Sequence, residues 1–233
     1  MDREFLVVFP LYAGVTQLDF TGPHEVLSRI PGGRCILAST AGGEVEADGG
    51  LVFARVHRLA DIERCDLLCV PGGFGTIGAI EDEALLTEIR RLACTAQYVT
   101  SVCTGALVLG AAGLLVGKRA TTHWAWRDAL AAFGAIPTPG RVVQDGNIVT
   151  GGGVTAGIDF GLTIMAEIAG AEYAQAVQLA IEYAPAPPFD AGRPDSAPPE
   201  IVAAVEQRRY AQIRPIRDAA VERAAARLAE RSA

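Results

Sequence analysis

Short apolar runs alternate with amphipathic stretches along most of the chain. The runs are rich in Val, Leu and Ile, and several end in Gly, Pro or a small polar residue, which is typical of buried strands. We expect strands over residues 3–10, 34–40, 50–57, 65–73, 98–102 and 119–123, and a hairpin over 141–153. The hairpin is predicted from the turn residues Asp145, Gly146 and Asn147 at its centre.

Between the strands, apolar residues recur at helical spacing. The pattern predicts helices over 21–30, 82–96, 104–115, 125–134, 155–170 and 171–183, and a terminal helix over roughly 200–231. Strands that alternate with helices predict an α/β fold with a mostly parallel sheet and helices on both faces. We therefore expect a flavodoxin-like three-layer sandwich, in which ligands bind at the carboxyl ends of the strands.

A Pro-rich stretch, 184–199, separates this pattern from the terminal helix. No internal repeat or linker precedes it, so residues 1–183 are predicted to form a single α/β domain. The segment 184–233 is predicted to be an arm and a helix that belong to the same domain. It is too short for a separate DNA-binding domain, which would need about 50 residues beyond the arm.

The composition indicates a water-soluble protein without a nucleic-acid or membrane partner. Half of the 233 residues are hydrophobic, 20% are charged, and the net charge is -7. Phosphate binding needs clustered Lys and Arg, whereas the arginines after residue 205 alternate with acidic residues and predict a solvated helix. No apolar run approaches the ~18 residues that span a bilayer, and the N-terminal residues resemble a strand more than a signal peptide. We expect a cytoplasmic protein with reduced cysteines.

Cys103 stands where the predicted strand 98–102 meets the predicted helix 104–115. The pattern Ser101-x-Cys103-x-Gly105 is a cysteine version of the nucleophile elbow, in which small residues let the strand and the helix approach closely. Amides and the dipole at a helix N-terminus favour a thiolate. A pKa lowered from about 8.5 to about 6 would leave the thiol about 90% ionised at pH 7. The alternative is an inert core cysteine.

The remaining cysteines are expected to be core residues. Cys65 and Cys69 have no second pair beside them, as a structural zinc site would require. The other two lie within a predicted strand and a predicted helix: Cys35 and Cys94.

A glycine-rich run, VPGGFGTIG, follows the strand that begins at residue 65. It has the letter pattern of a dinucleotide-binding loop, Gly73-x-Gly75-x-x-Gly78. The acidic residue that such a site needs about 20 residues later is missing, because the next strand ends in Cys103. We discount a nucleotide and expect the N–H groups of Gly72 and Gly73 to turn toward the elbow as an oxyanion hole.

Thr104 follows the cysteine, so an acid or base must come from another part of the chain. Asp19, in the loop after the first strand, has apolar neighbours; it is either a structural cap or a partly desolvated carboxyl with a raised pKa. Glu25 is the competing carboxylate, and His123 ends a predicted strand on the same rim. We place His123 and Glu25 in supporting positions near the site. Two further histidines are expected to be structural or exposed: His24 and His57.

Several stretches resemble the ThiJ/PfpI superfamily, a glutamine-amidotransferase-like α/β fold: SVCTGA at the elbow, VPGG before it and QLDFTGP near the N-terminus. YVTSVCTGALVLGAAGLLVGKRATTHWAW, VVQDGNIVTGGGVTAGIDFGLT and VQLAIEYAPAPPFDAG resemble the isonitrile hydratases within it. The resemblance implies a hydro-lyase that converts an isonitrile, R–N≡C, and water into an N-substituted formamide. It also implies a homodimer without a cofactor or metal.

By similarity, Cys103 would be the nucleophile that forms a thioimidate, Asp19 the acid/base and Thr104 a supporting polar contact. Gly72 and Gly73 would lie against the elbow. Three residues depart from the pattern expected for these hydratases. Phe74 and Thr76 stand in the glycine loop, where smaller residues are expected, and Phe20 follows the acid. These departures should reshape the substrate pocket.

Two other functions remain open at this point. Glyoxalase-like or chaperone-like stress proteins belong to the same superfamily, but they usually carry Glu where Asp19 stands. The sensor domains of AraC-type regulators share stretches such as LDFTGP and TAGID. Those regulators continue into a helix-turn-helix domain, which we do not expect after Ala233.

Overall fold

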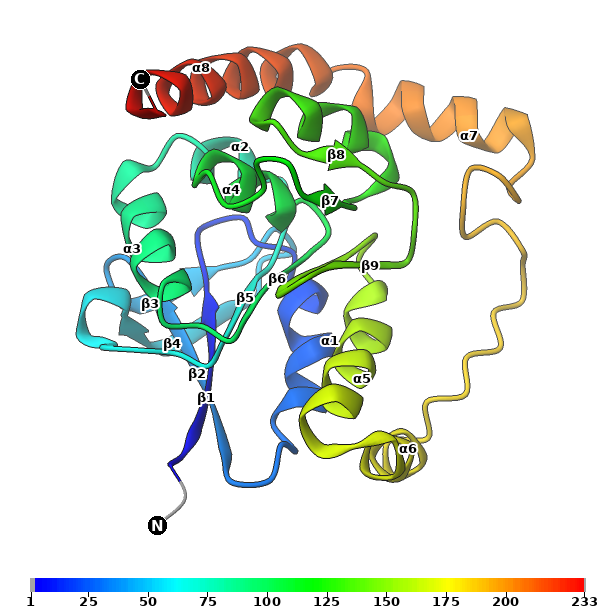
Figure 1. Ribbon diagram of the computed structural model, residues 1–233. Coiled ribbons are helices and arrows are strands. Elements are labelled where there is room, and N and C mark those ends of the chain that lie inside the picture. The colour runs from blue at the N-terminus through cyan, green and yellow to red at the C-terminus, as the bar shows by residue number, and fades with distance from the viewer. Residues whose placement is uncertain (1–2, 233) are drawn as a thin grey trace.

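An eight-stranded sheet lies between two layers of helices (Figure 1). The computed structural model describes residues 3–232. The strand order is β3-β4-β2-β1-β5-β6-β10-β9, and the paired strands are parallel except for β3–β4 and β9–β10. The strands are β1 (Phe5–Pro10), β2 (Gly33–Ser39), β3 (Gly43–Glu46), β4 (Val52–Arg58), β5 (Leu67–Val70), β6 (Tyr98–Val102), β9 (Val142–Asp145) and β10 (Ile148–Gly151). The mostly parallel α/β sandwich predicted from the sequence is confirmed.

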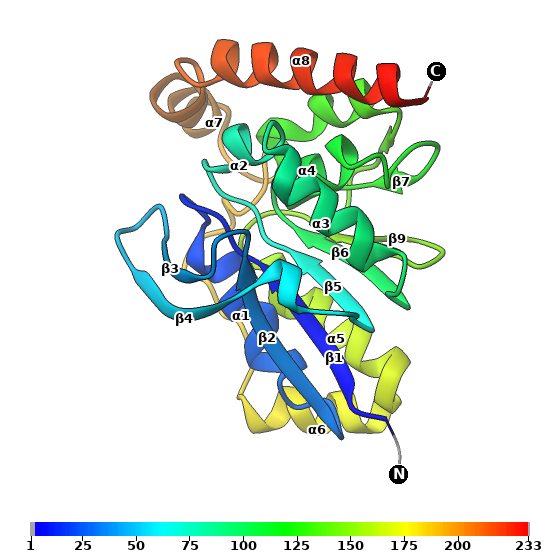
Figure 2. The same cartoon turned by 90° about the vertical axis from the view of Figure 1, so that its left-hand side faces the viewer.

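Two groups of helices cover the sheet (Figure 2). On one face α1 (Gln17–Leu27) packs against α5 (Ala156–Ala169), with α6 (Ala171–Ala180) beside it. On the other face lie α3 (Glu83–Ala93) and α4 (Gly105–Ala111), together with α2 (Thr76–Ala79). The long α8 (Arg214–Ser232) packs over α2, α4 and the 3-10 helix Trp124–Phe133.

Strand β1 shows how the sequence builds two cores. Leu6 and Val8 belong to the core beneath α3 and α4, whereas Val7 and Phe9 belong to the core beneath α1 and α5. Because side chains alternate along a strand, an unbroken apolar run serves both faces of a covered parallel sheet. Each side chain buried in this way contributes about 1.5–3 kcal/mol relative to exposure.

The strand order reverses at β1, which pairs with β2 on one side and β5 on the other. In doubly wound sheets a crevice opens at such a switch point, beyond the carboxyl ends of the strands. The segments that follow β1, β5 and β6 meet there. They carry Asp19, the Gly72–Gly73 turn and Cys103, the residues singled out from the sequence.

The first helix begins earlier than predicted: it spans Gln17–Leu27, so Asp19 lies in its first turn and Pro23 lies inside it. Close packing of α1 against α5 explains why Gly22 and Pro23, which are small or compact, stand in this helix. A Cβ on Gly157 would lie 2.7 Å from Pro23 Cδ, and one on Gly22 would lie 3.4 Å from Ile158 Cγ1.

Local differences from the prediction concern short elements. The helix predicted over 125–134 is a 3-10 helix over Trp124–Phe133, capped by Gly134 with a φ of 71°. The strand predicted over 119–123 shrinks to β7 (Arg119–Ala120), which pairs with β8 (Ile136–Pro137). The edge strand β3 and the short elements β8 and α2 were not predicted, because each has too few residues to show a strand-like or helical spacing of apolar residues.

The terminal helix predicted over 200–231 is three pieces: α7 (Pro199–Val205), a π-helical turn over Glu206–Tyr210, and α8. Arg217 anchors α8. Its side chain is 4% exposed, donates to the Ala125 carbonyl at 2.9 Å, and pairs with Asp128 and Asp218. Within residues 3–232, no helix has both the length and the apolar character needed to cross a membrane.

Candidate active site

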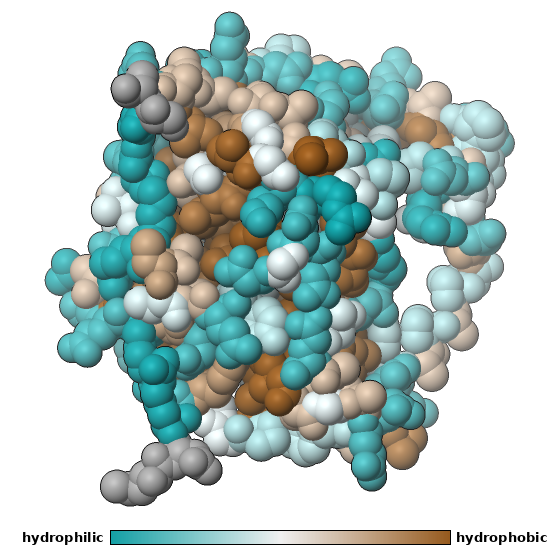
Figure 3. Space-filling view, in the orientation of Figure 1, coloured by the Kyte–Doolittle hydropathy of each residue, from teal (hydrophilic) through white to brown (hydrophobic). Residues whose placement is uncertain are grey.

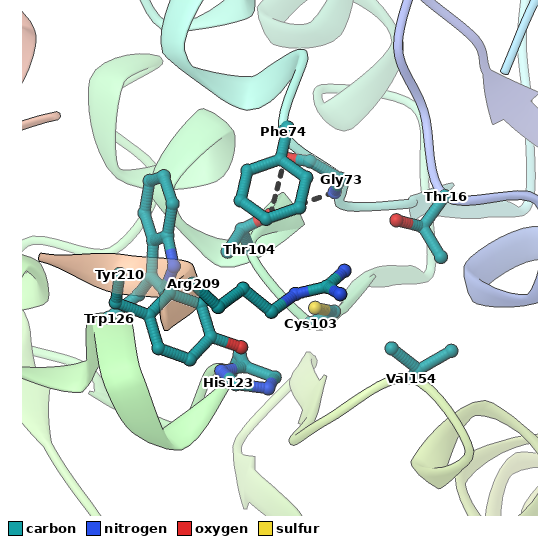
Figure 4. Close-up of a pocket in the computed structure, with 10 residues that line it drawn as sticks. All are labelled: Thr16, Gly73, Phe74, Cys103, Thr104, His123, Trp126, Val154, Arg209 and Tyr210. Carbon is teal, nitrogen blue, oxygen red and sulfur yellow. Dashed lines mark hydrogen bonds between the residues drawn. The ribbon is translucent and has the colours of Figure 1, made fainter. Parts of the chain in front are cut away.

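Cys103 forms a strained elbow between β6 and α4. Its φ is 54°, a left-handed conformation that costs a non-glycine residue on the order of 1 kcal/mol. The backbone is fixed on both sides: the Cys103 N–H donates to the Gly151 carbonyl at 3.0 Å, and its carbonyl accepts the Thr122 hydroxyl at 2.7 Å. A Cβ on Gly105 would lie 2.1 Å from the Val70 carbonyl oxygen, so the helix packs tightly under the turn. The thiol lines a pocket (Figure 4).

Asp19 is fully buried beside this thiol. Its Oδ2 atom accepts the Gly72 amide at 3.0 Å, while Oδ1 has no hydrogen bond of regular geometry within residues 3–232. Burial raises the pKa of Asp19 from 3.8 to about 7, and the nearby Asp48 adds to the rise. The interactions with the Cys103 thiol and the Gly72 amide oppose it. The carboxyl therefore titrates near neutral pH.

The electrostatics of Cys103 differ from the sequence-based expectation. Burial raises the pKa of the thiol, and the charge of Asp19 raises it further, whereas the Thr104 amide opposes the change. The helix N-terminus that was expected to lower this pKa is therefore outweighed by desolvation and by the neighbouring carboxylate. Groups that interact this strongly titrate as a pair. The second proton leaves the pair far less readily than the first.

Thr104 ties the glycine loop to the elbow. Its hydroxyl accepts the Gly73 amide at 2.9 Å, donates to the Gly73 carbonyl at 3.1 Å, and lies 2.8 Å from the Thr76 hydroxyl. A Cβ on Gly72 would lie 2.4 Å from the Thr104 backbone nitrogen, which only glycine avoids. The amides of Gly72 and Gly73 are thus bonded to Asp19 and Thr104. They position these two side chains and do not form the open oxyanion hole that the sequence predicted.

The pocket above the thiol is small, about 50 Å³, and four of its ten lining residues have aromatic rings. His123 lies in its wall, with its ring 5.7 Å from that of Tyr210. The Nδ1 atom of His123 accepts the Ala125 amide at 3.3 Å. Burial, aided by the charge of Arg209, lowers the pKa of His123 to about 4, so the ring is neutral at pH 7. The residues that line the pocket are Thr16, Gly73, Phe74, Cys103, Thr104, His123, Trp126, Val154, Arg209 and Tyr210.

Glu25 does not reach the site, so the sequence-based placement is wrong. The helix that holds Asp19 inward turns Glu25 to the exposed surface, where it pairs with Arg29 at 2.7 Å. Cys94, expected in the core, is exposed, whereas Cys65 and Cys69 are buried. In the part of the chain that the structure describes, no cluster of His, Cys, Asp or Glu side chains is arranged to hold a metal ion.

Sequence reasoning missed the contribution of the C-terminal segment. Arg209 and Tyr210 lie in the π-helical turn and line the pocket, although the arginines of this region were assigned to a solvated helix. No pattern in the sequence relates this turn to the elbow, because the contact depends on how α8 packs. Phe74, noted as a departure in the glycine loop, does line the pocket.

Comparisons with known proteins agree with this geometry. Residues 6–167 match the model of the DJ-1/PfpI family. The chain is similar to the isonitrile hydratase of Pseudomonas putida, with 51% identity over 94% of this chain and 96% of that protein. It is also similar to a crystal structure of a ThiJ/PfpI family protein from Pseudomonas syringae, with a TM-score of 0.89 and 38% identity over 96% of this chain and 91% of that chain. The HTH-type transcriptional regulator CdhR of Pseudomonas aeruginosa is 35% identical over 58% of this chain and 41% of the regulator.

Proposed function

The chain belongs to the DJ-1/PfpI family, and on this basis we propose that it is an isonitrile hydratase, a lyase that converts R–N≡C and water into an N-substituted formamide. The observation that carries the proposal is the buried pair of Asp19 and Cys103. A thiol held in a strained turn is placed against a carboxyl whose Oδ1 atom has no hydrogen bond of regular geometry within residues 3–232. Such a pair supplies a nucleophile and a proton at one point of a small pocket.

The first half of the reaction forms a thioimidate. The terminal carbon of an isonitrile accepts a soft nucleophile, and the sulfur of Cys103 attacks it while the proton of the pair passes through Asp19 to the same carbon. The S–C and C–H bonds form, and the product is R–N=CH–S-Cys103. The proton that leaves the thiol ends on carbon, so no other acid is consumed. A carboxyl with a pKa of about 7 can both accept and release this proton near neutral pH.

The second half releases the formamide. Water adds to the thioimidate carbon, with Asp19 as the base that takes one of its protons and returns it to nitrogen. The tetrahedral adduct R–NH–CH(OH)–S-Cys103 then collapses. The C–S bond breaks, the hydroxyl proton of the adduct passes through Asp19 to the sulfur, and R–NH–CHO leaves. Thr104, Gly72 and Gly73 act in this proposal by holding Asp19 and the loop in place. His123 is neutral and contributes a polar wall, since its pKa of about 4 rules out an imidazolium at pH 7.

The test is formamide release from p-nitrophenyl isocyanide by the purified protein, with methylglyoxal as the substrate of the alternative glyoxalase function. We expect formamide from the wild type, none from Cys103→Ala, and at least ~10²-fold less from Asp19→Asn, the lower range for a lost general acid. Full activity of Cys103→Ala would contradict the mechanism. Turnover of methylglyoxal alone would favour the stress-protein function instead.

We further propose that the protein is a cytoplasmic homodimer and that residues 184–233 belong to the same domain as the sheet. Exposed apolar side chains support the dimer: Leu179 is 81% and Phe189 is 79% exposed. The buried anchor Arg217 supports the assignment of α8 to the domain. Sedimentation equilibrium of the purified chain measures the oligomeric state directly.

A further inference from the structure

Arg209 is the one charged side chain among the residues described as lining the pocket. It reaches from the side of Tyr210 across the pocket toward Thr16, with its guanidinium group over Phe74 (Figure 4). The guanidinium carbon lies 5.1 Å from the centre of the Phe74 ring. No salt bridge joins Arg209 to an acidic side chain within residues 3–232.

Arg209 differs in this respect from other arginines of the terminal segment. Arg214 pairs with Glu206, Arg217 with Asp128, and Arg223 with Glu81. The space-filling view shows hydrophilic side chains interspersed with more apolar ones along the top of the molecule, where α8 lies (Figure 3). The charge of Arg209 is directed into the pocket, where its neighbours are the face of the Phe74 ring and the Tyr210 side chain. A cation–aromatic contact of this kind is worth about 0.5–1 kcal/mol when exposed.

The π-helical turn fixes the position of Arg209. Its last residue, Tyr210, is 8% exposed and packs against His123 and Trp124, with ring centres 5.7 and 5.6 Å away. A π-turn inserts an extra residue into a helix, and such turns are frequent at functional sites. Here the turn directs both Arg209 and Tyr210 toward the thiol. His123 adds no second positive charge, because its pKa is about 4.

We propose that Arg209 selects isonitriles whose substituent carries a carboxylate, a proposal that rests on the hydratase function. When the isonitrile carbon is bonded to Cys103, the substituent R extends into the pocket lined by Phe74 and Arg209. An arginine presents a planar fork of donors that matches a carboxylate in two parallel hydrogen bonds. The apolar part of R would contact the faces of Phe74 and Trp126. The preferred substrate is therefore an unsaturated or aromatic isonitrile that bears a carboxylate.

A matched pair of substrates tests this proposal: 4-isocyanobenzoate and its neutral methyl ester. Formamide release is measured for the wild type, Arg209→Met, Arg209→Lys and the neighbouring control Arg208→Met. The quantity compared is the ratio of kcat/KM for the carboxylate to kcat/KM for the ester. We expect the wild type to favour the carboxylate and Arg209→Met to lower the ratio about tenfold or more, as for a lost hydrogen bond to a charged group.

The loss should lie mainly in KM, because the contact with the carboxylate is made equally in the ground state and the transition state. Arg209→Lys, which keeps the charge but not the fork, should retain part of the preference. Arg208→Met, an exposed change outside the pocket, should leave the ratio within about twofold. An equal loss for both substrates in Arg209→Met would overturn the proposal, since it would place the effect of Arg209 on Cys103 itself.

The wild-type measurements distinguish a failure of the proposed role of Arg209 from a failure of the hydratase function. Hydration of the ester without a preference for the carboxylate would overturn the role of Arg209 and leave the hydratase function standing. Formamide from neither substrate would overturn the hydratase function and, with it, the proposed selectivity.

Discussion

The carboxyl of Asp19 and the thiol of Cys103 share one buried site, and each changes the ionisation of the other. The charge of Asp19 raises the pKa of Cys103, while the thiol lowers that of Asp19 against the larger effect of burial. Near neutral pH the pair therefore keeps one proton, because losing it would leave two negative charges side by side. The resting site thus stores the proton that the isonitrile carbon needs beside the sulfur that attacks it.

The pair should give the reaction a defined pH dependence. Loss of the first proton, with a pKa of about 7 for Asp19, creates the singly protonated pair in which one group can accept a proton from the other. We expect kcat/KM for p-nitrophenyl isocyanide to rise between pH 5 and pH 8 and to level off above the pKa. Asp19→Asn should remove this rise along with most of the activity. A wild-type kcat/KM that falls across this pH range would contradict the proposal that the singly protonated pair is the active form.

Asp19 should also make the protein less stable as the pH rises. The pKa of its carboxyl is higher in the folded protein, about 7, than the usual 3.8, so its contribution is complete below pH ~4 and is lost as the pH passes 7. Urea unfolding at pH 5 and pH 8 measures this directly. Relative to Asp19→Asn, the wild type should lose about 2–3 kcal/mol between these values, at about 1.4 kcal/mol per pKa unit.

The comparison with Asp19→Asn removes the contribution of other groups. His123, whose pKa falls to about 4 in the folded protein, stabilises the fold above its usual pKa of 6.5 and loses that effect as the pH falls. Both proteins contain His123, so this opposite trend cancels in the difference. Parallel curves for the two proteins would show that the carboxyl does not titrate in this range.

The elbow could be predicted from the sequence because its determinants are local. Small residues at Ser101 and Gly105 around a cysteine indicate a tight strand-to-helix turn, and parallel strands necessarily end at the same rim. Asp19 and the Gly72–Gly73 turn follow strands of that sheet, so their proximity to Cys103 could be inferred without coordinates.

The rest of the site depends on information that is not local. Glu25 was misplaced because the helix begins at Gln17, which sets its rotation and turns Glu25 outward. The pKa of Cys103 was misjudged because the helix dipole acts locally, whereas burial and the charge of Asp19 come from the tertiary structure. Arg209 escaped notice because its turn reaches the pocket only through the packing of α8.

Gly72 and Gly78, at the two ends of the glycine-rich run, should differ strongly in how well they tolerate an added methyl group. A Cβ at Gly72 would lie 2.4 Å from Thr104 N, 2.5 Å from Thr104 Oγ1 and 2.8 Å from Asp19 Oδ2. Gly72→Ala should therefore destabilise the protein by about 1–3 kcal/mol or more, as for overpacking, and sharply lower activity. Thermal unfolding and formamide release are the measurements.

Gly78, at the end of the same glycine-rich run, is the matched control. A Cβ there would meet nothing within 4 Å, and the residue lies in the helix α2. Gly78→Ala should leave activity unchanged and stabilise the protein by about 0.5–1 kcal/mol, the usual gain for alanine within a helix. Equal tolerance at both positions would contradict the close approach of Gly72 to the elbow.

The hydroxyl of Thr104 should matter more than its methyl group. The hydroxyl is the hydrogen-bond partner of the Gly73 amide and carbonyl and of Thr76, and all of these contacts are buried. Thr104→Val keeps the shape but leaves the Gly73 amide without its acceptor, which costs about 1–3 kcal/mol in the free energy of unfolding. The loosened loop also holds the Gly72 amide, the partner of Asp19 Oδ2, so kcat should fall as well. Thr104→Ser should retain both stability and kcat. If the Val variant kept both its stability and its kcat, the hydroxyl would have no positioning role. If the Ser variant were as impaired as the Val variant, the methyl group would matter as much as the hydroxyl.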